Sequence, residues 1–186
     1  MKISEAIRER RSVKRFTDRA VSRADIETLL DAAVLAPNHR LTQPWHFFVL
    51  GPEARTAYGL ALGDRKARKI ADPAAAQAMR EAVAREHHAL PAMIAVGVTT
   101  TADVEAAEED YAATMMGVAN LGLVALEHGL GTQIRTGAIL NDPAARQAIG
   151  VADGLRVVAV VNVGEPADLP PARARTPATE RTTWVE

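Results

Sequence analysis

The chain has 186 residues, 48% of them apolar and 24% charged, and its formal net charge is -1 at pH 7. This length fits one domain of ordinary size, or two very small ones, and the apolar share is enough to fill a core. The near-neutral charge argues against a general nucleic-acid binder, because such proteins are usually strongly basic. The absence of cysteine excludes disulfides, thiolate catalysis and cysteine-ligated metals, and it fits a reducing cytosol.

The sequence shows neither a signal peptide nor a membrane-spanning segment. The first five residues, Met1–Glu5, contain no apolar segment of the kind found in signal peptides. No run approaches eighteen apolar residues without a charge, so we expect no membrane span. We therefore expect a cytoplasmic protein with no membrane partner.

A basic strip follows the first expected helix, which covers residues 4–10. Five cations and one hydroxyl lie within the nine residues from Arg8 to Phe16. If the backbone is extended here, Arg10, Ser12 and Lys14 point to one face. The planar donors of arginine match phosphate oxygens, so this face is a candidate anion site. The alternative is a solvated basic helix end, where cations offset the helix dipole.

The remaining elements alternate between helical and extended patterns without a regular β-α-β order. Ser22 and Asp25 form a capping box that opens a helix ending at Ala36–Pro37. Further helices are expected over 53–70, 73–89 and 104–128, with a short one from 141–143. Strands are expected over 45–50, 91–98, 132–136 and 155–163. The pattern predicts an α+β fold.

Two polar groups outside the strip have simple interpretations. Residues 108–110, at the start of the long helix, are acidic and predict a solvated face. His87 and His88 adjoin Glu86, but neighbouring residues on a helix diverge by about 100°, which disfavours a metal site. No G-x-G-x-x-G motif, P-loop or G-x-S-x-G motif occurs. We therefore predict no metal and no side-chain nucleophile.

The composition changes after Gly164–Pro166. The last 21 residues contain four prolines and three arginines and show little periodicity. An arm of this kind either lies on another surface or stays disordered, and Trp184 near its end favours a surface. We expect one domain over residues 1–186, with residues 166–186 as the arm.

Four motifs, in order along the chain, resemble those of the FMN-dependent nitroreductase family. Arg10–Phe16 resembles the family's opening R-R-S-x-R/K-x-F motif, and Gln43–Phe47 resembles its Q-P-W-x-F motif. Gly129–Thr132 resembles the G-L-G-T turn after the central helix, and Val163–Pro166 resembles the end of the last strand. The short length is most similar to the minimal YdjA-type subgroup.

This resemblance implies a mainly antiparallel sheet flanked by helices, in an intertwined homodimer with FMN at its interface. It also implies that the C-terminal arm reaches over the partner subunit. The residues it assigns to FMN are Arg10, Arg11 and Ser12 at the phosphate and ribityl end, Lys14 near flavin N1 and O2, Leu35 and His39 from the other subunit, and Ile134, Arg135 and Thr136 along the ring or phosphate side.

The sequence also departs from the family pattern. Leu41 stands where many larger relatives have an asparagine that contacts the flavin. Some relatives use a late arginine for the phosphate, and either Arg173 or Arg175 could serve here. Residues 51–90 are the least similar segment, and in the family this region shapes the pocket over the flavin.

The leading functional hypothesis is an FMN oxidoreductase that uses NADH or NADPH to reduce a nitro compound, a quinone or a similar small acceptor. Because the cofactor carries the hydride, this hypothesis predicts ping-pong kinetics. It requires no nucleic-acid partner. The alternative is a non-catalytic protein that binds an anion or a nucleic acid through the basic strip.

Overall fold

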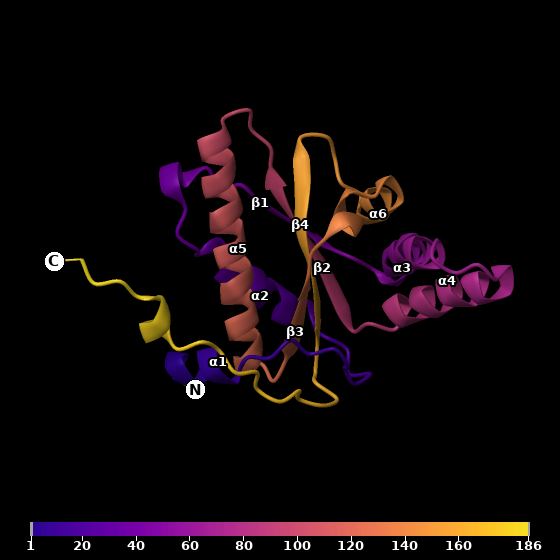
Figure 1. The fold of residues 1–186 in the computed structure, drawn as a ribbon, viewed down its shortest axis with the longest axis horizontal. Helices are drawn as coiled ribbons and strands as arrows, with labels where there is room; N and C mark the ends of the chain where they lie inside the picture. The colour runs from indigo at the N-terminus through magenta and orange to yellow at the C-terminus, as the bar shows by residue number, and fades with distance from the viewer. Residues whose placement is uncertain (1, 186) are drawn as a thin grey trace.

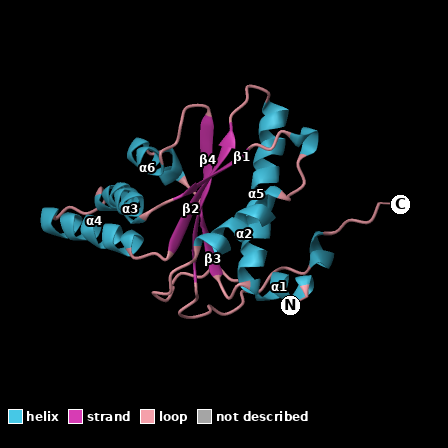
Figure 2. Ribbon diagram, turned by 180° about the vertical axis from the view of Figure 1, so that it is seen from behind, coloured by secondary structure: helices cyan, strands magenta, loops and turns pink. Residues whose placement is uncertain are grey.

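A four-stranded sheet separates two layers of helices in the computed structural model, which describes residues 2–185 (Figures 1 and 2). The strand order is β1-β2-β4-β3, and every neighbouring pair is antiparallel. The strands are β1 (Trp45–Val49), β2 (Ala92–Thr99), β3 (Gly131–Arg135) and β4 (Leu155–Gly164). The predicted α+β class and antiparallel sheet are confirmed.

Within residues 2–185, six α-helices flank the sheet. Helices α2 and α5 cover one face, and α3, α4 and α6 lie on the other, as both views show. The helices are α1 (Ile3–Glu9), α2 (Arg23–Val34), α3 (Pro52–Ala67), α4 (Pro73–His88), α5 (Val104–Glu127) and α6 (Pro143–Ile149). Each begins within two residues of its expected position, and the ends that were predicted agree within three, which is the usual uncertainty of boundaries read from sequence.

Short polar side chains fix where most helices begin. The Ser22 hydroxyl accepts a hydrogen bond from the Asp25 amide, as the capping box predicts. Asp72, Asp103 and Asp142 cap α4, α5 and α6 in the same way. Each cap satisfies an amide that has no partner within its own helix, a contribution of typically about 1 kcal/mol.

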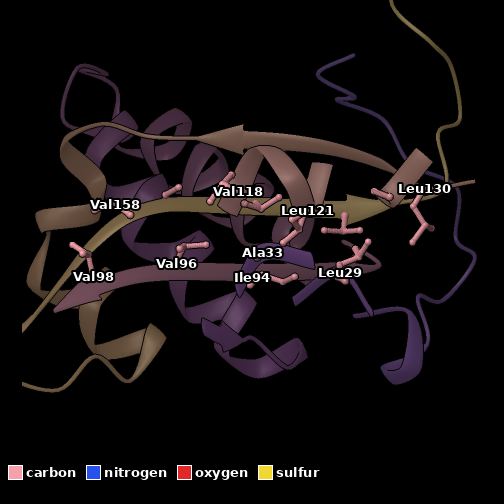
Figure 3. Packing of buried hydrophobic residues seen from close by; sticks show 14 residues of the cluster. Leu29, Ala33, Ile94, Val96, Val98, Val118, Leu121, Leu130 and Val158 are labelled. Atoms are coloured by element: carbon pink, nitrogen blue, oxygen red, sulfur yellow. The ribbon is translucent and has the colours of Figure 1, made fainter. Parts of the chain in front are cut away.

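The two central strands, β2 and β4, are buried on both faces. One core cluster joins Ile94 and Val96 of β2 to Val118 and Leu121 of α5 (Figure 3). A second cluster, on the other face, contains Met93 and joins the sheet to α3 and α6. A continuous apolar run is what a strand covered by helices on both sides requires.

Helix α2 approaches α5 most closely at Gly117. A Cβ at this position would lie 2.6 Å from the carbonyl oxygen of Ala33, closer than atoms can approach without a backbone shift. Gly117 therefore sets the spacing of the layer that carries α2 and the loop after it.

The C-terminal segment leaves the body of the molecule (Figure 1). Between residues 169 and 185 almost every side chain is exposed, and Trp184 is 89% exposed. A short 3-10 turn, Ala178–Arg181, is its one helical piece within the described chain. Over the same described residues, no helix has the length and apolarity that a membrane span needs.

We expect Gly117→Ala to destabilise the fold. Overpacking of this kind costs about 1–3 kcal/mol, and the better helix propensity of alanine returns at most about 1 kcal/mol. Urea denaturation measures the difference. Gly122→Ala is the matched control on the same helix, because its Cβ would meet the Thr132 hydroxyl oxygen at 3.3 Å and can be accommodated. Equal stabilities of the two variants would contradict this account of the contact.

Candidate functional site

The basic strip lies along the free edge of β3. The Val13 amide donates a 2.9 Å hydrogen bond to the Thr132 carbonyl oxygen, and Ser12 forms a parallel bridge with the same residue. Val13 is buried against Gly131, where a Cβ would collide with its side chain. The strip is thus anchored by backbone and by one apolar side chain, and its polar side chains remain at the surface.

The cations of the strip fall into two groups. Arg15 makes a two-pronged contact with Asp168, with both hydrogen bonds 3.0 Å long, and Arg11 donates to the carbonyl oxygens of Arg8 and Arg10. The side chains of Arg10 and Lys14 form no hydrogen bond or ion pair with residues 2–185. These two cations are therefore available to a ligand.

A cleft of about 540 Å³ opens beside Lys14. Its other walls come from Phe16, from the end of α4 and the loop after it, and from Gln133 and Asn162 on the sheet. Asn162 is 3% exposed, and its Oδ1 has no hydrogen-bond partner within residues 2–185. A buried acceptor without a partner costs stability, so it marks a place where a ligand donor could bind.

The predicted residues of β3 lie on both of its faces. Arg135 shares the face of Gln133, two residues away, and its Nη1 donates to His87 Nε2 at 3.1 Å. Ile134 points to the opposite face and is partly exposed. Thr136 lies just beyond the strand and lines a separate cavity of about 260 Å³.

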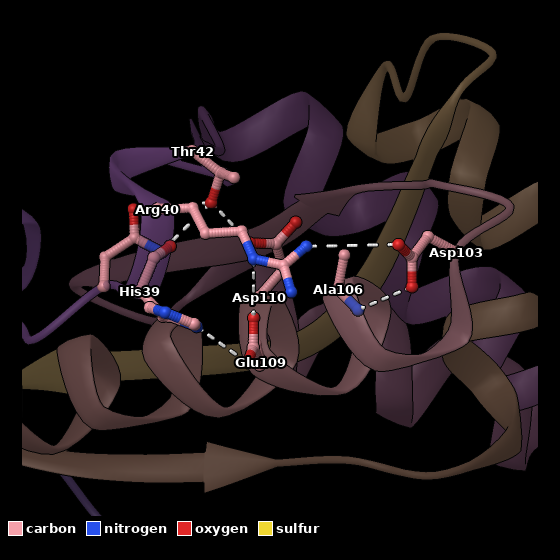
Figure 4. Close-up of polar contacts among 8 residues, drawn as sticks. His39, Arg40, Thr42, Asp103, Ala106, Glu109 and Asp110 are labelled. Carbon is pink, nitrogen blue, oxygen red and sulfur yellow. Dashed lines mark hydrogen bonds and ion pairs between the residues drawn. The ribbon is translucent and has the colours of Figure 1, made fainter.

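The loop that carries His39 packs on the first half of α5 (Figure 4). His39 Nδ1 lies 2.8 Å from Glu109 Oε1, and the guanidinium of Arg40 lies 3.7 Å from the other oxygen of the same carboxylate. The Thr42 hydroxyl donates to Asp110, which is 6% exposed. The prediction of a solvated acidic face holds for Glu108, which is exposed, but it was wrong for Glu109 and Asp110, whose carboxylates hold the loop.

Three residues of this loop adopt the left-handed conformation without being glycine. They are Arg40 (φ 63°), Leu41 (φ 51°) and Gln43 (φ 47°), each at a cost of roughly 1–2 kcal/mol. Asn38 holds the turn: its Oδ1 accepts from the Gln43 amide at 2.7 Å, and its Nδ2 donates to Thr42. Strain of this kind clusters at ligand sites and switch regions.

Within one chain, the predicted residues form two separate groups. The loop that carries His39 contacts α5 at Glu109, whereas Arg10 packs near Gly122 on the same helix. Thirteen residues of helix separate these two contacts, about 20 Å at 1.5 Å per residue. Leu35, 80% exposed, lies at the end of α2, in the same segment as His39. One chain thus places Arg10, Ser12 and Lys14 along the edge of β3, and Leu35 and His39 lie away from that edge.

The sequence prediction missed the residues that form the cleft. Asn162 had a signal, since it is the one amide in a predicted strand whose other residues, apart from Arg156, are apolar. His87, which adjoins the cleft residue Glu86 without lining the cleft itself, had none, because its burial depends on how α4 packs on α3 and β3. Gln133 and Glu86 resemble ordinary surface residues in the sequence.

A family model and the relatives found by sequence comparison all point to the same family. The family model described as "Nitroreductase family" matches residues 7–165. YfhC of Bacillus subtilis, named as an NAD(P)H nitroreductase, is 32% identical over 97% of this chain and 93% of its own length. YdjA of Escherichia coli K12, named in the same way, is 28% identical over 87% of each chain.

Solved structures agree with the sequence matches. A nitroreductase-like family protein from Bacillus cereus superposes with a TM-score of 0.87 at 31% identity, over 100% of this chain and 97% of that one. A nitroreductase from Desulfovibrio desulfuricans, solved in complex with FMN, superposes with a TM-score of 0.74 at 25% identity. That match covers 99% of this chain and 96% of the other.

Proposed function

Because the chain belongs to the nitroreductase family, we propose that it is an FMN-dependent oxidoreductase that takes electrons from NADH or NADPH. The full-length relative YfhC is named for the nicotinamide donor, and the Desulfovibrio relative was solved with FMN. The electron acceptor that we propose is a nitro compound, a quinone or a similar small molecule. When bound, FMN would supply the hydride chemistry in two half-reactions, first with the nicotinamide and then with the acceptor.

The observation that carries this proposal is the cleft with unpaired polar groups around it. Its volume of about 540 Å³ lies in the range of cofactor sites, roughly 300–1,000 Å³. Asn162 Oδ1 supplies a buried acceptor, and Lys14 supplies a cation with no carboxylate partner among residues 2–185. A mononucleotide that offers both donors and negative charge fits this set of groups.

Each residue then has a defined task. Arg10 and Ser12 would hold the phosphate and ribityl end, where a charge pair at 4 Å contributes roughly 4 kcal/mol at an effective dielectric of 20, before desolvation. Arg11 faces backbone carbonyls, so its contribution would come through its charge or after a change of rotamer. Lys14 would stabilise negative charge on the pyrimidine end of the ring.

The complete site is proposed to need two copies of the chain. The two groups of residues lie about 20 Å apart along α5 in one protomer, so His39 and Leu35 would reach the ligand only from a partner subunit. In an antiparallel packing of α5 against its copy, the loop of each protomer faces the basic strip of the other. This arrangement would put one FMN at each end of the interface.

An apolar stripe on α5 supports such a homodimer. Met116 and Ala119, three residues apart on one side of this helix, are exposed. Ile3 and Ile7 of α1 are exposed as well, and α1 lies near the C-terminal end of α5. Contiguous exposed apolar surface of this kind marks protein interfaces. The arm, with Trp184 at 89% exposure, would lie on the partner subunit in the same assembly.

We expect the purified protein to bind FMN and to turn yellow, and NADH or NADPH to bleach that colour under anaerobic conditions. Lys14→Met should raise the FMN dissociation constant by roughly tenfold or more, because hydrogen bonds to charged groups contribute about 1.5–3 kcal/mol. Lys69→Met, at an exposed lysine with no ion pair to residues 2–185, is the matched control. A colourless protein that does not bind added FMN, but retards RNA in a gel, would instead support the alternative of a non-catalytic nucleic-acid-binding protein.

We expect Met116→Glu to break the dimer and to weaken FMN binding with it, because it places a charge in the apolar stripe. Sedimentation velocity measures the first effect and FMN fluorescence quenching the second. Leu60→Glu is the matched control: Leu60 is 43% exposed on α3, against 42% for Met116. A Met116→Glu variant that remains dimeric and binds FMN normally would rule out this interface.

A further inference from the structure

The imidazole of His87 is held in one protonation state by its two neighbours. His87 is 1% exposed, and its Nδ1 lies 2.8 Å from the carbonyl oxygen of Val83, which can only accept. Its Nε2 lies 3.1 Å from Nη1 of Arg135, which can only donate. Both contacts are satisfied by one species alone, the neutral ring with its proton on Nδ1. In a charged ring, Nε2 would also carry a proton, and two donors would then face each other.

Arg135 has a charge that the chain does not balance. Its side chain is half-buried on the same face of β3 as Gln133, which lines the cleft, although Arg135 itself is not one of the lining residues. Among residues 2–185 it has no carboxylate within ion-pair distance. Its one hydrogen-bond partner in that range is the uncharged His87. A partly buried cation without a counter-charge is costly, so the arrangement favours an anionic ligand beside it.

We propose that His87 is a positioning residue of the cofactor site: its neutral imidazole holds the Arg135 guanidinium in place on the cleft side of β3, where the cation faces the bound flavin nucleotide. This inference rests on the function proposed above. It assigns a task to a residue of α4, the helix whose segment resembles the family least.

The close packing of α3 against α4 fixes the position of the His87 side chain, so the imidazole cannot shift with Arg135. A Cβ at Gly59 of α3 would lie 2.9 Å from Ala84 Cα and 3.0 Å from His87 Cβ, so α4 packs directly on the α3 backbone here. The Tyr58 ring covers the imidazole from the same side, with ring centroids 5.7 Å apart. His87 is therefore a fixed acceptor, and Arg135 must come to it.

The contact between the neutral His87 ring and the Arg135 guanidinium, called the clamp below, has a predictable dependence on pH. Burial is the main cause that lowers the pKa of His87, and the cations Arg135 of β3 and Lys66 of α3 lower it further. The contact with the Val83 carbonyl and the charge of Glu86, on its own helix, act in the opposite direction. The clamp is thus intact above the ordinary histidine pKa of about 6.5, and it opens as the pH falls through the lower value of the folded protein.

The experiment compares three variants in their affinity for FMN, measured by fluorescence quenching from pH 7.5 to 5. His87→Leu removes the acceptor, His87→Gln keeps an acceptor that does not titrate, and His88→Gln makes the same change at the exposed neighbour. We expect His87→Leu to bind FMN about tenfold more weakly at pH 7.5. His87→Gln should lie within about threefold of wild type there, and binding by His88→Gln should equal that of wild type at every pH.

The pH profile separates a clamp from simple packing. The ratio of the wild-type to the His87→Gln dissociation constant should rise as the pH falls through the pKa of His87 in the folded protein, which burial holds below the ordinary histidine value. Titration of the FMN phosphate cancels in this ratio because both proteins share it. In a double-mutant cycle, Arg135→Met should remove most of the effect of His87→Leu. Additive effects, or a ratio that does not change with pH, would overturn the proposal.

Nuclear magnetic resonance of the protein without FMN tests the clamp independently of the cofactor. The ¹⁵N shifts of His87 should report the Nδ1-protonated neutral ring at pH 7, and Arg135→Met should change its titration. If the protein fails to bind FMN but keeps this signature, the proposed function is wrong and the clamp remains. If wild type and His87→Leu bind FMN equally, the function stands and the positioning role of His87 is wrong.

Discussion

Positive charge that the chain leaves unbalanced along the free edge of β3 is the feature on which the rest depends. The same strip contains a balanced cation, Arg15, which meets Asp168 and holds the pKa of that carboxyl below its ordinary value. Three residues beyond the strip, Arg19 meets Glu165. Arg10, Lys14 and Arg135 have no such partner among residues 2–185. Some cations of this region therefore have a carboxylate partner and others have none. A bound anionic ligand is the simplest partner for the cations that have none.

The long helix α5 separates the two groups of residues that we propose to form one site. It packs its buried side on the sheet and on α2, through Gly117, and this contact fixes the loop with His39 at one end of the helix and the basic strip at the other. The strained turns of that loop are held by Asn38 and by the carboxylate of Glu109, at a measurable cost in free energy. Backbone strain of this kind is typical of ligand sites, but this loop lies far from the cleft of its own chain. It is therefore suited to complete the cleft of a second copy of the chain.

Sequence reasoning predicted the elements well because their signals are local. Caps such as Ser22 and apolar runs such as those of β2 and β4 act within a few residues. The contacts that define the site are distant in sequence: Thr42 meets Asp110 across 68 residues, and His87 meets Arg135 across 48. The sequence of α5 is apolar on nearly all sides of its middle part, a pattern typical of a buried helix, so the exposure of Met116 could not be read from composition.

A mixed dimer tests most directly whether the site is shared between subunits. One chain carries Arg10→Glu and Lys14→Glu, the other carries Leu35→Glu and His39→Glu, and differently tagged copies are co-expressed and purified as the heterodimer. If each site combines the strip of one chain with the loop of the other, one of the two sites is intact, and the heterodimer binds one FMN with wild-type affinity although neither parent dimer does. A heterodimer that binds FMN no better than its parents would contradict the account, because both groups would then come from the same chain.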